Sequence, residues 1–240
     1  MIFARILIYL SIATAAVFVL SGYGYQWGIW EMGTGFMLLR YSAYAAIGLT
    51  VISLAGLWFL RKSGFKAITY SVTAFILMAA ASGTAIYWQQ KAQSVPPIHD
   101  ITTDIENPPQ FMAMVRLRAD APNPPDYEGG ETARAQQEAY PHIQPLEISA
   151  DIQEVMDYAV MLITQRKWEL VAINRMDGRI EATEKLAWFG FKDDVVLRFT
   201  ETENGTRVDM RSKSRIGRGD IGVNANRIDS FLSDLENEFS

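Results

Sequence analysis

Residues 206–239 read TRVDMRSKSRIGRGDIGVNANRIDSFLSDLENEF, and this stretch contains the strand, turn and helix from which the fold can be worked out. Apolar and charged residues alternate over Thr206–Ser212, as expected for a half-buried strand. A single apolar stripe follows at helical spacing, formed by Ile228, Phe231, Leu232, Leu235 and Phe239. The stretch therefore predicts a strand, a glycine-rich turn and a closing helix.

The residues before this stretch predict more strands of the same sheet. The strand-like runs are Lys167–Ile173, Arg179–Glu184, Leu186–Phe191 and Val195–Thr200. The pairs Asp177-Gly178 and Asn204-Gly205 are typical of hairpin turns. A helix beginning near Ser149 or Asp151 precedes the strands, because its apolar residues recur at helical spacing. Residues 149–240 therefore predict an α+β domain, an antiparallel meander sheet with flanking helices.

The segment of residues 93–148 contains all nine prolines of the chain. Its Pro-Pro pairs favour extended chain and block helix formation, so we expect a proline-rich linker that wraps the domain. His99 with Asp100 and Asp104 is weak evidence for a metal site, since a single histidine at this spacing is more typical of a surface turn. We expect neither a metal nor another cofactor.

Residues 1–92 have the composition of a membrane domain. Three uncharged apolar stretches are long enough to span a bilayer, Ile6–Gly22, Tyr41–Leu60 and Ala67–Trp88. Aromatic residues gather at their ends, as is typical of rings at the level of the lipid headgroups. The stretches are apolar all round, whereas core helices of soluble proteins have a polar face. We therefore predict three N-terminal transmembrane α-helices.

Basic residues predict the orientation of these helices. Arg5 precedes the first span, and Arg61, Lys62 and Lys66 lie between the second and third. The positive-inside rule places both regions in the cytoplasm, so three crossings put the C-terminal domain on the outer, periplasmic side of the inner membrane. Cleavage of the first span as a signal peptide would leave the same outward domain, but no clear cleavage site follows it.

Charge and cysteine content exclude several classes of function. Residues 95–240 hold 26 acidic and 16 basic side chains, so we expect no binding to nucleic acid. The chain has no cysteine, which excludes disulfides and thiol catalysis. The spans lack ionisable residues, which favours an anchor over a transporter. We expect the lipid bilayer as a partner, together with an envelope protein or an anionic ligand.

The basic run before the closing helix contains the pattern G-x-G-x-x-G at Gly217, Gly219 and Gly222. A dinucleotide-binding fold needs this pattern in its first βαβ unit, with a parallel strand following. Here only one helix follows, so a dinucleotide site is excluded. The glycines instead predict a turn that the backbone can approach closely.

Three roles remain open for this turn. Asp220 or Asn224 can cap the closing helix, and a helix N-terminus with nearby arginines attracts anions. The candidate anion- or partner-binding residues are Arg211, Ser212, Ser214, Arg215, Asn224 and Arg227. The second role is a structural clasp, formed by Asp193, Asp194, Arg211 and Asp220, in which Arg211 pairs with Asp193 and Asp194. The third is catalysis, with Asp193 or Asp194 as acid or base. We expect Arg215 to be the arginine that is free for a ligand.

Three segments resemble a known family. They are PPIHDITTDIENPPQF (residues 96–111), WFGFKDDVVLRF (188–199) and VDMRSKSRIGRGDIGVNANRI (208–228). They look like the signature of the DUF1499 family, a family of unknown function, and the resemblance covers roughly residues 95–240. Many relatives are lipid-anchored or carry a cysteine near the first segment, whereas this chain has three apolar helices instead, so it resembles a membrane-anchored sub-group. The resemblance implies a bacterial-type envelope domain and implies no activity.

Together these observations predict an integral inner-membrane protein that presents an extracytoplasmic binding or scaffolding domain. The alternative is an envelope enzyme acting on an anionic substrate that carries phosphate or carboxylate. The buried or open environment of Asp193 and Asp194 distinguishes the two, because an open cleft favours chemistry and burial against arginine favours a structural role.

Overall fold

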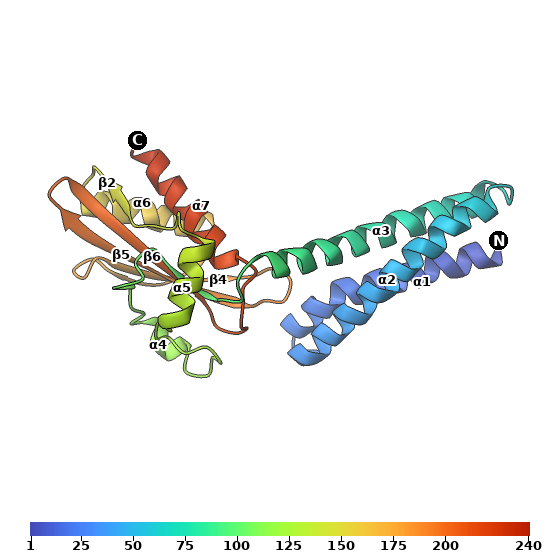
Figure 1. Cartoon of the computed structure of the whole chain (residues 1–240), viewed down its shortest axis with the longest axis horizontal. Helices are drawn as coiled ribbons and strands as arrows, with labels where there is room; N and C mark the ends of the chain where they lie inside the picture. Colours follow the sequence, from blue (N-terminus) through green and yellow to red (C-terminus); the bar gives the residue numbers. More distant parts are fainter. The chain divides into compact units, whose positions relative to one another are not determined.

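The computed structural model describes all 240 residues and divides into two compact units. The first, which we call the membrane unit, consists of Met1–Gln93 together with Ala187–Gly190. The second, which we call the α+β unit, consists of Ser94–Leu186 and Phe191–Ser240. Figure 1 shows both units and labels their helices and most of the strands.

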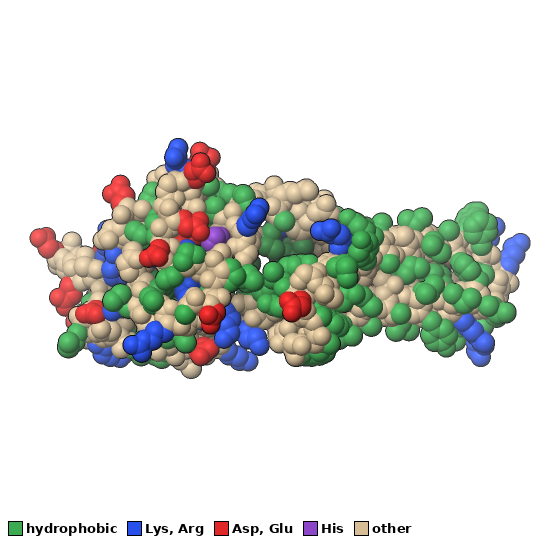
Figure 2. Space-filling model, turned by 90° about the horizontal axis from the view of Figure 1, so that it is seen from below, with side chains coloured by type: hydrophobic (Ala, Val, Ile, Leu, Met, Phe, Trp, Pro, Cys, Tyr) green, Lys and Arg blue, Asp and Glu red, His purple; other side chains and the backbone are tan.

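The membrane unit contains three long helices, α1 (Ile2–Gln26), α2 (Met32–Leu60) and α3 (Phe65–Ser94). Each is long and apolar enough to cross a membrane. Hydrophobic side chains cover much of the visible surface of this unit (Figure 2), which fits a lipid environment better than water. The prediction of three N-terminal apolar helices is confirmed.

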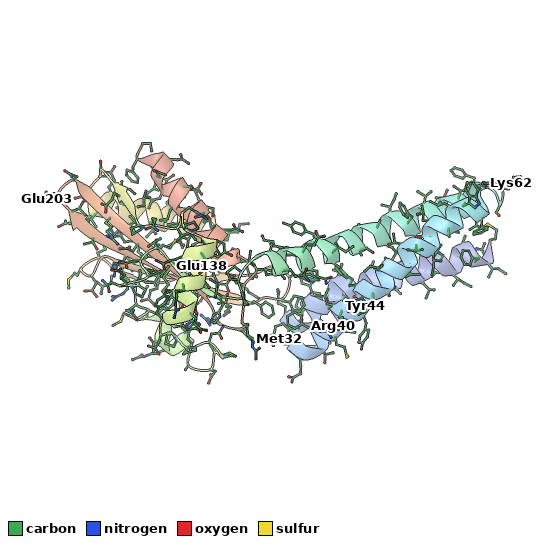
Figure 3. The ribbon with its side chains drawn as sticks, in the orientation of Figure 1. Met32, Arg40, Tyr44, Lys62, Glu138 and Glu203 are labelled. Atoms are coloured by element: carbon green, nitrogen blue, oxygen red, sulfur yellow. The ribbon has the colours of Figure 1, made fainter.

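Small hydroxyl side chains lie between these helices, and no charged side chain is buried there. The buried serines are Ser11, Ser21, Ser42, Ser53, Ser71 and Ser82. Thr50 Oγ1 lies 3.1 Å from Ser82 Oγ and connects α2 to α3. Small residues at such positions allow helix backbones to approach closely in a membrane. Arg40 and Tyr44 point outward from α2, and Lys62 lies in the turn before α3 (Figure 3).

The aromatic turn Ala187–Gly190 belongs to the membrane unit. Trp188 Nε1–H donates a hydrogen bond to Val19 O at 2.8 Å, and Phe189 stacks on Phe36 with ring centroids 5.1 Å apart. Phe189 is buried as a result. The two rings therefore contribute to the packing of α1 and α2.

The predicted strand Leu186–Phe191 is wrong. Leu186 N–H donates to Phe191 O and closes the segment as a turn, in which Gly190 has a φ of 67°. The composition of this segment resembles that of a strand because aromatic residues are common in sheets. Its rings are buried against helices, not within a sheet, and hydrophobicity alone does not distinguish the two environments.

The α+β unit is built on one antiparallel sheet of six strands. The strands are β1 (Asp100–Thr102), β2 (Leu146–Ile148), β3 (Glu169–Asn174), β4 (Arg179–Lys185), β5 (Lys192–Thr202) and β6 (Gly205–Ser214). They lie in the order β1-β6-β5-β4-β3, and β2 also pairs with β6. The helices of the unit are α4 (Met114–Leu117), α5 (Gly130–Ala139), α6 (Ile152–Gln165) and α7 (Val223–Glu238). The predicted α+β class is confirmed.

Both glycines predicted to mark hairpins lie at hairpin turns. Gly178 has a φ of 55°, and a Cβ there would lie 2.2 Å from Phe199 O. Gly205 has a φ of 143°, and a Cβ there would lie 2.1 Å from Ile148 O. Glycine is required at both positions because any side chain would meet backbone. Glu203 lies at the tip of the β5–β6 hairpin (Figure 3).

Helices α6 and α7 cover one face of the sheet and enclose the main hydrophobic core. The core includes Val195, Leu197 and Met210 of β5 and β6, all fully buried. Trp168 stacks on Phe231 of α7, with ring centroids 5.6 Å apart. The apolar stripe of the closing helix therefore packs on the sheet, which is the arrangement that its spacing predicted.

The opposite face of the sheet is covered by residues 104–128, which we call the strap. Phe111 and Met114 of the strap pack on Val196 of β5. Glu181 of β4 accepts hydrogen bonds from the backbone N–H groups of residues 112–114, at the start of α4. The proline-rich segment that contains the strap also supplies strands β1 and β2 to the sheet.

Candidate functional site

The basic run of residues 211–215 is divided between the two faces of the sheet. Ser212 and Ser214 point toward α7, whereas Arg211, Lys213 and Arg215 point toward the strap. Successive side chains of a strand point to opposite faces, so this run cannot form a single site. Three polar clusters result, one on the helix face of the sheet and two under the strap.

The first cluster, which we call the helix-face cluster, joins α7 to the sheet through Asn224 and Arg227. Ser212 Oγ–H donates to Asn224 Oδ1 at 2.6 Å, and Asn224 Nδ2–H donates to Ser214 Oγ at 3.0 Å. Arg227 Nη2–H donates to Asp193 Oδ2 at 2.7 Å. Its Nε–H donates to the Glu184 carboxylate at 2.6 Å. These buried bonds fix the first two turns of α7 against β4, β5 and β6.

Asp220 caps α7. Its carboxylate accepts hydrogen bonds from the backbone N–H groups of Gly222 at 2.9 Å and Asn224 at 2.6 Å. Burial raises the pKa of Asp220, although these two N–H groups act in the opposite direction. Of the two predicted caps, Asp220 is therefore the one that binds the helix end, while the Asn224 side chain belongs to the helix-face cluster.

The second cluster lies under the strap and is centred on Asp194. The fully buried Asp194 carboxylate accepts hydrogen bonds from Arg118 Nη1 at 2.7 Å and Thr183 Oγ1 at 2.7 Å. Arg215 donates to both oxygens, from Nε at 2.8 Å and from Nη2 at 2.9 Å. The expectation that Arg215 is free for a ligand is therefore wrong, because β5 places a carboxylate directly beside it.

The third cluster, also under the strap, is centred on Asp100 of β1. Arg211 donates to both oxygens of Asp100 at 2.8 Å, and Lys213 Nζ lies 3.1 Å from Oδ2. The side chains of all three residues are fully buried. The Arg211 guanidinium also lies over the rings of Phe111 and Tyr127, at 4.9 and 5.3 Å from their centroids.

In these two strap-face clusters, four cations surround two buried carboxylates. Other N–H groups of these cations connect the strap and the sheet through backbone carbonyls. Arg211 Nη2 donates to Pro125 O at 3.0 Å, and Lys213 Nζ donates to Asp126 O at 2.7 Å. Arg215 Nη1 donates to Leu117 O at 3.2 Å. The cations of the sheet therefore hold the strap in place.

The geometry pairs the predicted clasp residues differently from the expectation. Arg211 pairs with Asp100 rather than with Asp193 or Asp194, and Asp220 caps a helix. The residues that sequence reasoning missed are Asp100, Arg118, Thr183, Glu184 and Lys213. The sequence did contain one signal for them. Lys213 lies between Arg211 and Arg215 at strand spacing, so three basic side chains share one face of the strand and need buried carboxylates from other segments.

This arrangement offers no obvious acid or base for chemistry. Asp193 and Asp194 are buried and ion-paired with arginines. Two cavities, of about 360 and 140 Å³, are lined by none of the predicted site residues. Across residues 1–240, no group of three or more His, Cys, Asp or Glu side chains is placed to hold a metal ion. The geometry therefore resembles a structural network more than a reaction centre.

Burial of Lys213 gives the protein a pH-dependent contribution to stability. Burial lowers the pKa of Lys213, and Asp100 opposes this effect only in part. The pKa of Lys213 is lower in the folded protein than in the unfolded chain. At a pH between these two pKa values, the folded protein therefore binds fewer protons than the unfolded chain. Stability therefore rises with pH across this window, whose upper end is about pH 10.4.

We expect the melting temperature of the natural protein, relative to a Lys213→Met variant, to rise as the pH is raised toward about 10. Calorimetric melting of both proteins in detergent measures this difference. Burial raises the pKa of Tyr127 to about 12, so this tyrosine lowers stability as the pH rises above about 10, but both proteins contain it and its effect cancels in the comparison. Parallel pH profiles for the two proteins would show that Lys213 has the same pKa in the folded and unfolded chain.

Comparison with known proteins adds the family. The family model described as "Protein of unknown function (DUF1499)" matches residues 100–235, a range that begins at β1 and ends within α7. This range contains all three clusters and the strap. No curated protein matches the sequence.

Proposed function

The chain belongs to the DUF1499 family, and from this premise we propose that it is a multi-pass inner-membrane protein that presents the α+β unit as an extracytoplasmic binding or scaffolding domain. The membrane unit is the anchor in this proposal. Its helices have spanning length, and their interior is lined with hydroxyl groups and carries no buried charge. Transport pathways usually need buried ionisable groups, so an anchoring role is favoured.

The proposed orientation rests on the basic residues. Arg61 and Lys62 lie in the turn between α2 and α3, and Lys66 lies in the first turn of α3. Arg5 lies near the start of α1. A cytoplasmic position for all four places the end of α3, and the chain that follows it, outside the cytoplasm.

A binding role is favoured over an enzymatic one by a single observation. Asp193 and Asp194, the carboxylates that would serve as acid or base, are both buried and bonded to arginine. A catalytic acid or base needs access to substrate. Nothing in the geometry favours an enzyme acting on an anionic substrate, since the arginines of the basic run also have carboxylate partners.

The orientation predicts a definite reporter pattern. An enzyme reporter that is active only outside the cytoplasm should be active when fused after Ser240 and inactive when inserted between Arg61 and Lys66. A reporter that folds only in the cytoplasm should give the reverse pattern at the same two positions and serves as the matched control. Activity of the first reporter in the Arg61–Lys66 turn would place the α+β unit in the cytoplasm and overturn the proposal.

A further inference from the structure

The cavity of about 360 Å³ in the α+β unit has no role in the clusters described above. It is an open groove of about 360 Å³ between the segment that follows β1 and the segment that precedes β2. Its walls include Asp104, Glu106, Gln137, Tyr140, Gln144 and Arg207. We call it the fork groove, because β1 and β2 both pair with the same edge of β6 and diverge at this point.

The backbone around the fork groove is already paired. Thr103 N–H donates to Met210 O at 2.9 Å, and Met210 N–H donates to Thr103 Oγ1 at 3.0 Å. On the outer side of β1, the Gln136 side-chain amide bonds both the N–H and the C=O of Thr102, at 3.1 and 2.6 Å. A peptide strand therefore finds no open edge here, and a ligand has to be recognised by side chains.

The charges of the groove do not suit an anion. Arg207 donates to the carboxylates of Asp104 and Asp209, at 3.2 and 3.1 Å. The hydrogen bond to Asp209 is the main reason that the pKa of Arg207 is raised. Arg198 also bonds Asp104 and Asp209, and Glu106 is exposed at the rim, so three carboxylates face two guanidinium groups. An anionic ligand would meet a net negative wall.

A metal ion is not favoured either. Asp104 Oδ1 accepts hydrogen bonds from the backbone N–H groups of Glu106 and Asn107, at 3.1 and 2.8 Å. Asp104 Oδ2 accepts from Arg198 and Arg207, both at 3.2 Å. Both oxygens of this carboxylate are therefore occupied, and Glu106 alone does not make a metal site.

The side chains that remain available are uncharged hydrogen-bonding groups and flat apolar surfaces. Gln137 is exposed on α5 and makes no side-chain hydrogen bond in the structure, and Gln144 makes a single long one, to Pro141 O at 3.3 Å. A glutamine amide both donates and accepts. The Tyr140 ring and Pro145 add flat apolar surface beside these amides.

We infer that the fork groove binds a neutral saccharide. Sugar hydroxyls both donate and accept hydrogen bonds, which matches the two glutamine amides, and the C–H faces of a sugar ring suit tyrosine and proline. The volume lies at the lower end of the range of roughly 300–1,000 Å³ that is usual for small-molecule sites, so the site takes a short saccharide. The inference rests on the proposed binding role and gives that role a ligand class.

Binding of disaccharides to the purified full-length chain tests this inference. The probes are N,N′-diacetylchitobiose, cellobiose and maltose, with inorganic phosphate as the anionic comparison. The protein is held in a detergent without a sugar headgroup, because maltosides would compete. We expect saturable binding of at least one disaccharide by calorimetry or thermophoresis, and no binding of phosphate at the groove.

Two variants locate the binding. The double substitution Gln137→Ala and Gln144→Ala should weaken disaccharide binding at least about tenfold and leave the melting temperature unchanged, because Gln137 is exposed without a side-chain hydrogen bond and Gln144 makes one weak bond. Gln165→Ala, an exposed glutamine at the end of α6, is the matched control and should bind as the natural protein does.

Three outcomes overturn the inference. They are failure of all three disaccharides to bind, binding that survives the double substitution, and phosphate that competes with a bound disaccharide. These assays do not depend on membrane orientation. A protein with the predicted reporter pattern and no saccharide binding therefore refutes the fork-groove ligand and leaves the proposed function standing.

Discussion

Replacing Asp194 with asparagine is expected to lower the free energy of unfolding of the α+β unit by about 3–5 kcal/mol. The substitution keeps the shape of the side chain and removes its charge. Arg118, which is fully buried, and Arg215 then lose the carboxylate that both of them contact. An uncompensated buried charge is costly, and domains are stable by only about 5–15 kcal/mol, so the loss is a large part of the stability.

Calorimetric melting of the full-length protein in detergent measures this loss. The control is Asp157→Asn, which removes the carboxylate of an exposed ion pair with Arg175. Exposed pairs contribute little, so no clear change is expected there. Equal melting temperatures for both variants would mean that the Asp194 cluster does not stabilise the fold, and the case for a structural rather than a catalytic Asp194 would fail.

Replacing Asp100 with asparagine is expected to loosen the strap as well as to destabilise the unit. Arg211 and Lys213 would lose their shared carboxylate while remaining buried, again at a cost of about 3–5 kcal/mol. Arg211 and Lys213 also donate hydrogen bonds to backbone carbonyls of the strap, so a shift of either side chain also breaks its bond to the strap. We expect faster tryptic cleavage after Arg116, an exposed strap residue.

The effect of Asp100 can be separated from a general loss of stability. Without the Asp100 carboxylate, Arg211 and Lys213 are two buried cations that have lost their shared partner, and adding Lys213→Met removes one of them. We therefore expect the double variant to melt at a higher temperature than Asp100→Asn, because the effects of two substitutions in one network on stability are not additive. Glu147→Gln, on the exposed face of the neighbouring strand β2, is the control and should leave cleavage unchanged. A double variant that is less stable than Asp100→Asn would contradict the explanation that unpaired buried cations destabilise the unit.

Strong periodic signals in the sequence predicted most of the elements. The alternation over Thr206–Ser212 appears as β6, and the stripe that includes Phe231 appears as the buried face of α7. Long apolar stretches gave the three membrane-unit helices. In each case the pattern is local, because it depends on the period of a helix or a strand, and a local pattern is visible in one sequence.

Short or atypical elements were not predictable in this way. Strands β1 and β2 have three residues each, too few for a period to be recognised, and they exist because β6 offers them an edge to pair with. Helix α5 lies within the proline-rich segment, where composition favours extended chain. The aromatic turn was mistaken for a strand because hydrophobic composition does not specify what covers a ring.

The candidate site shows the same division. The sequence alone indicated that residues 211–215 are basic, that they precede a capped helix, and that Asp193 and Asp194 lie just before a predicted strand. Only the tertiary structure decided their partners, because Asp100 and Arg118 come from segments about a hundred residues away in the chain from Arg211 and Arg215. The alternation of side chains along a strand fixes the face to which each charged side chain points, and this is a local property of the chain. Which opposite charge it meets depends on segments far away in the sequence, so the ion pairs form only when the sheet and the strap have assembled.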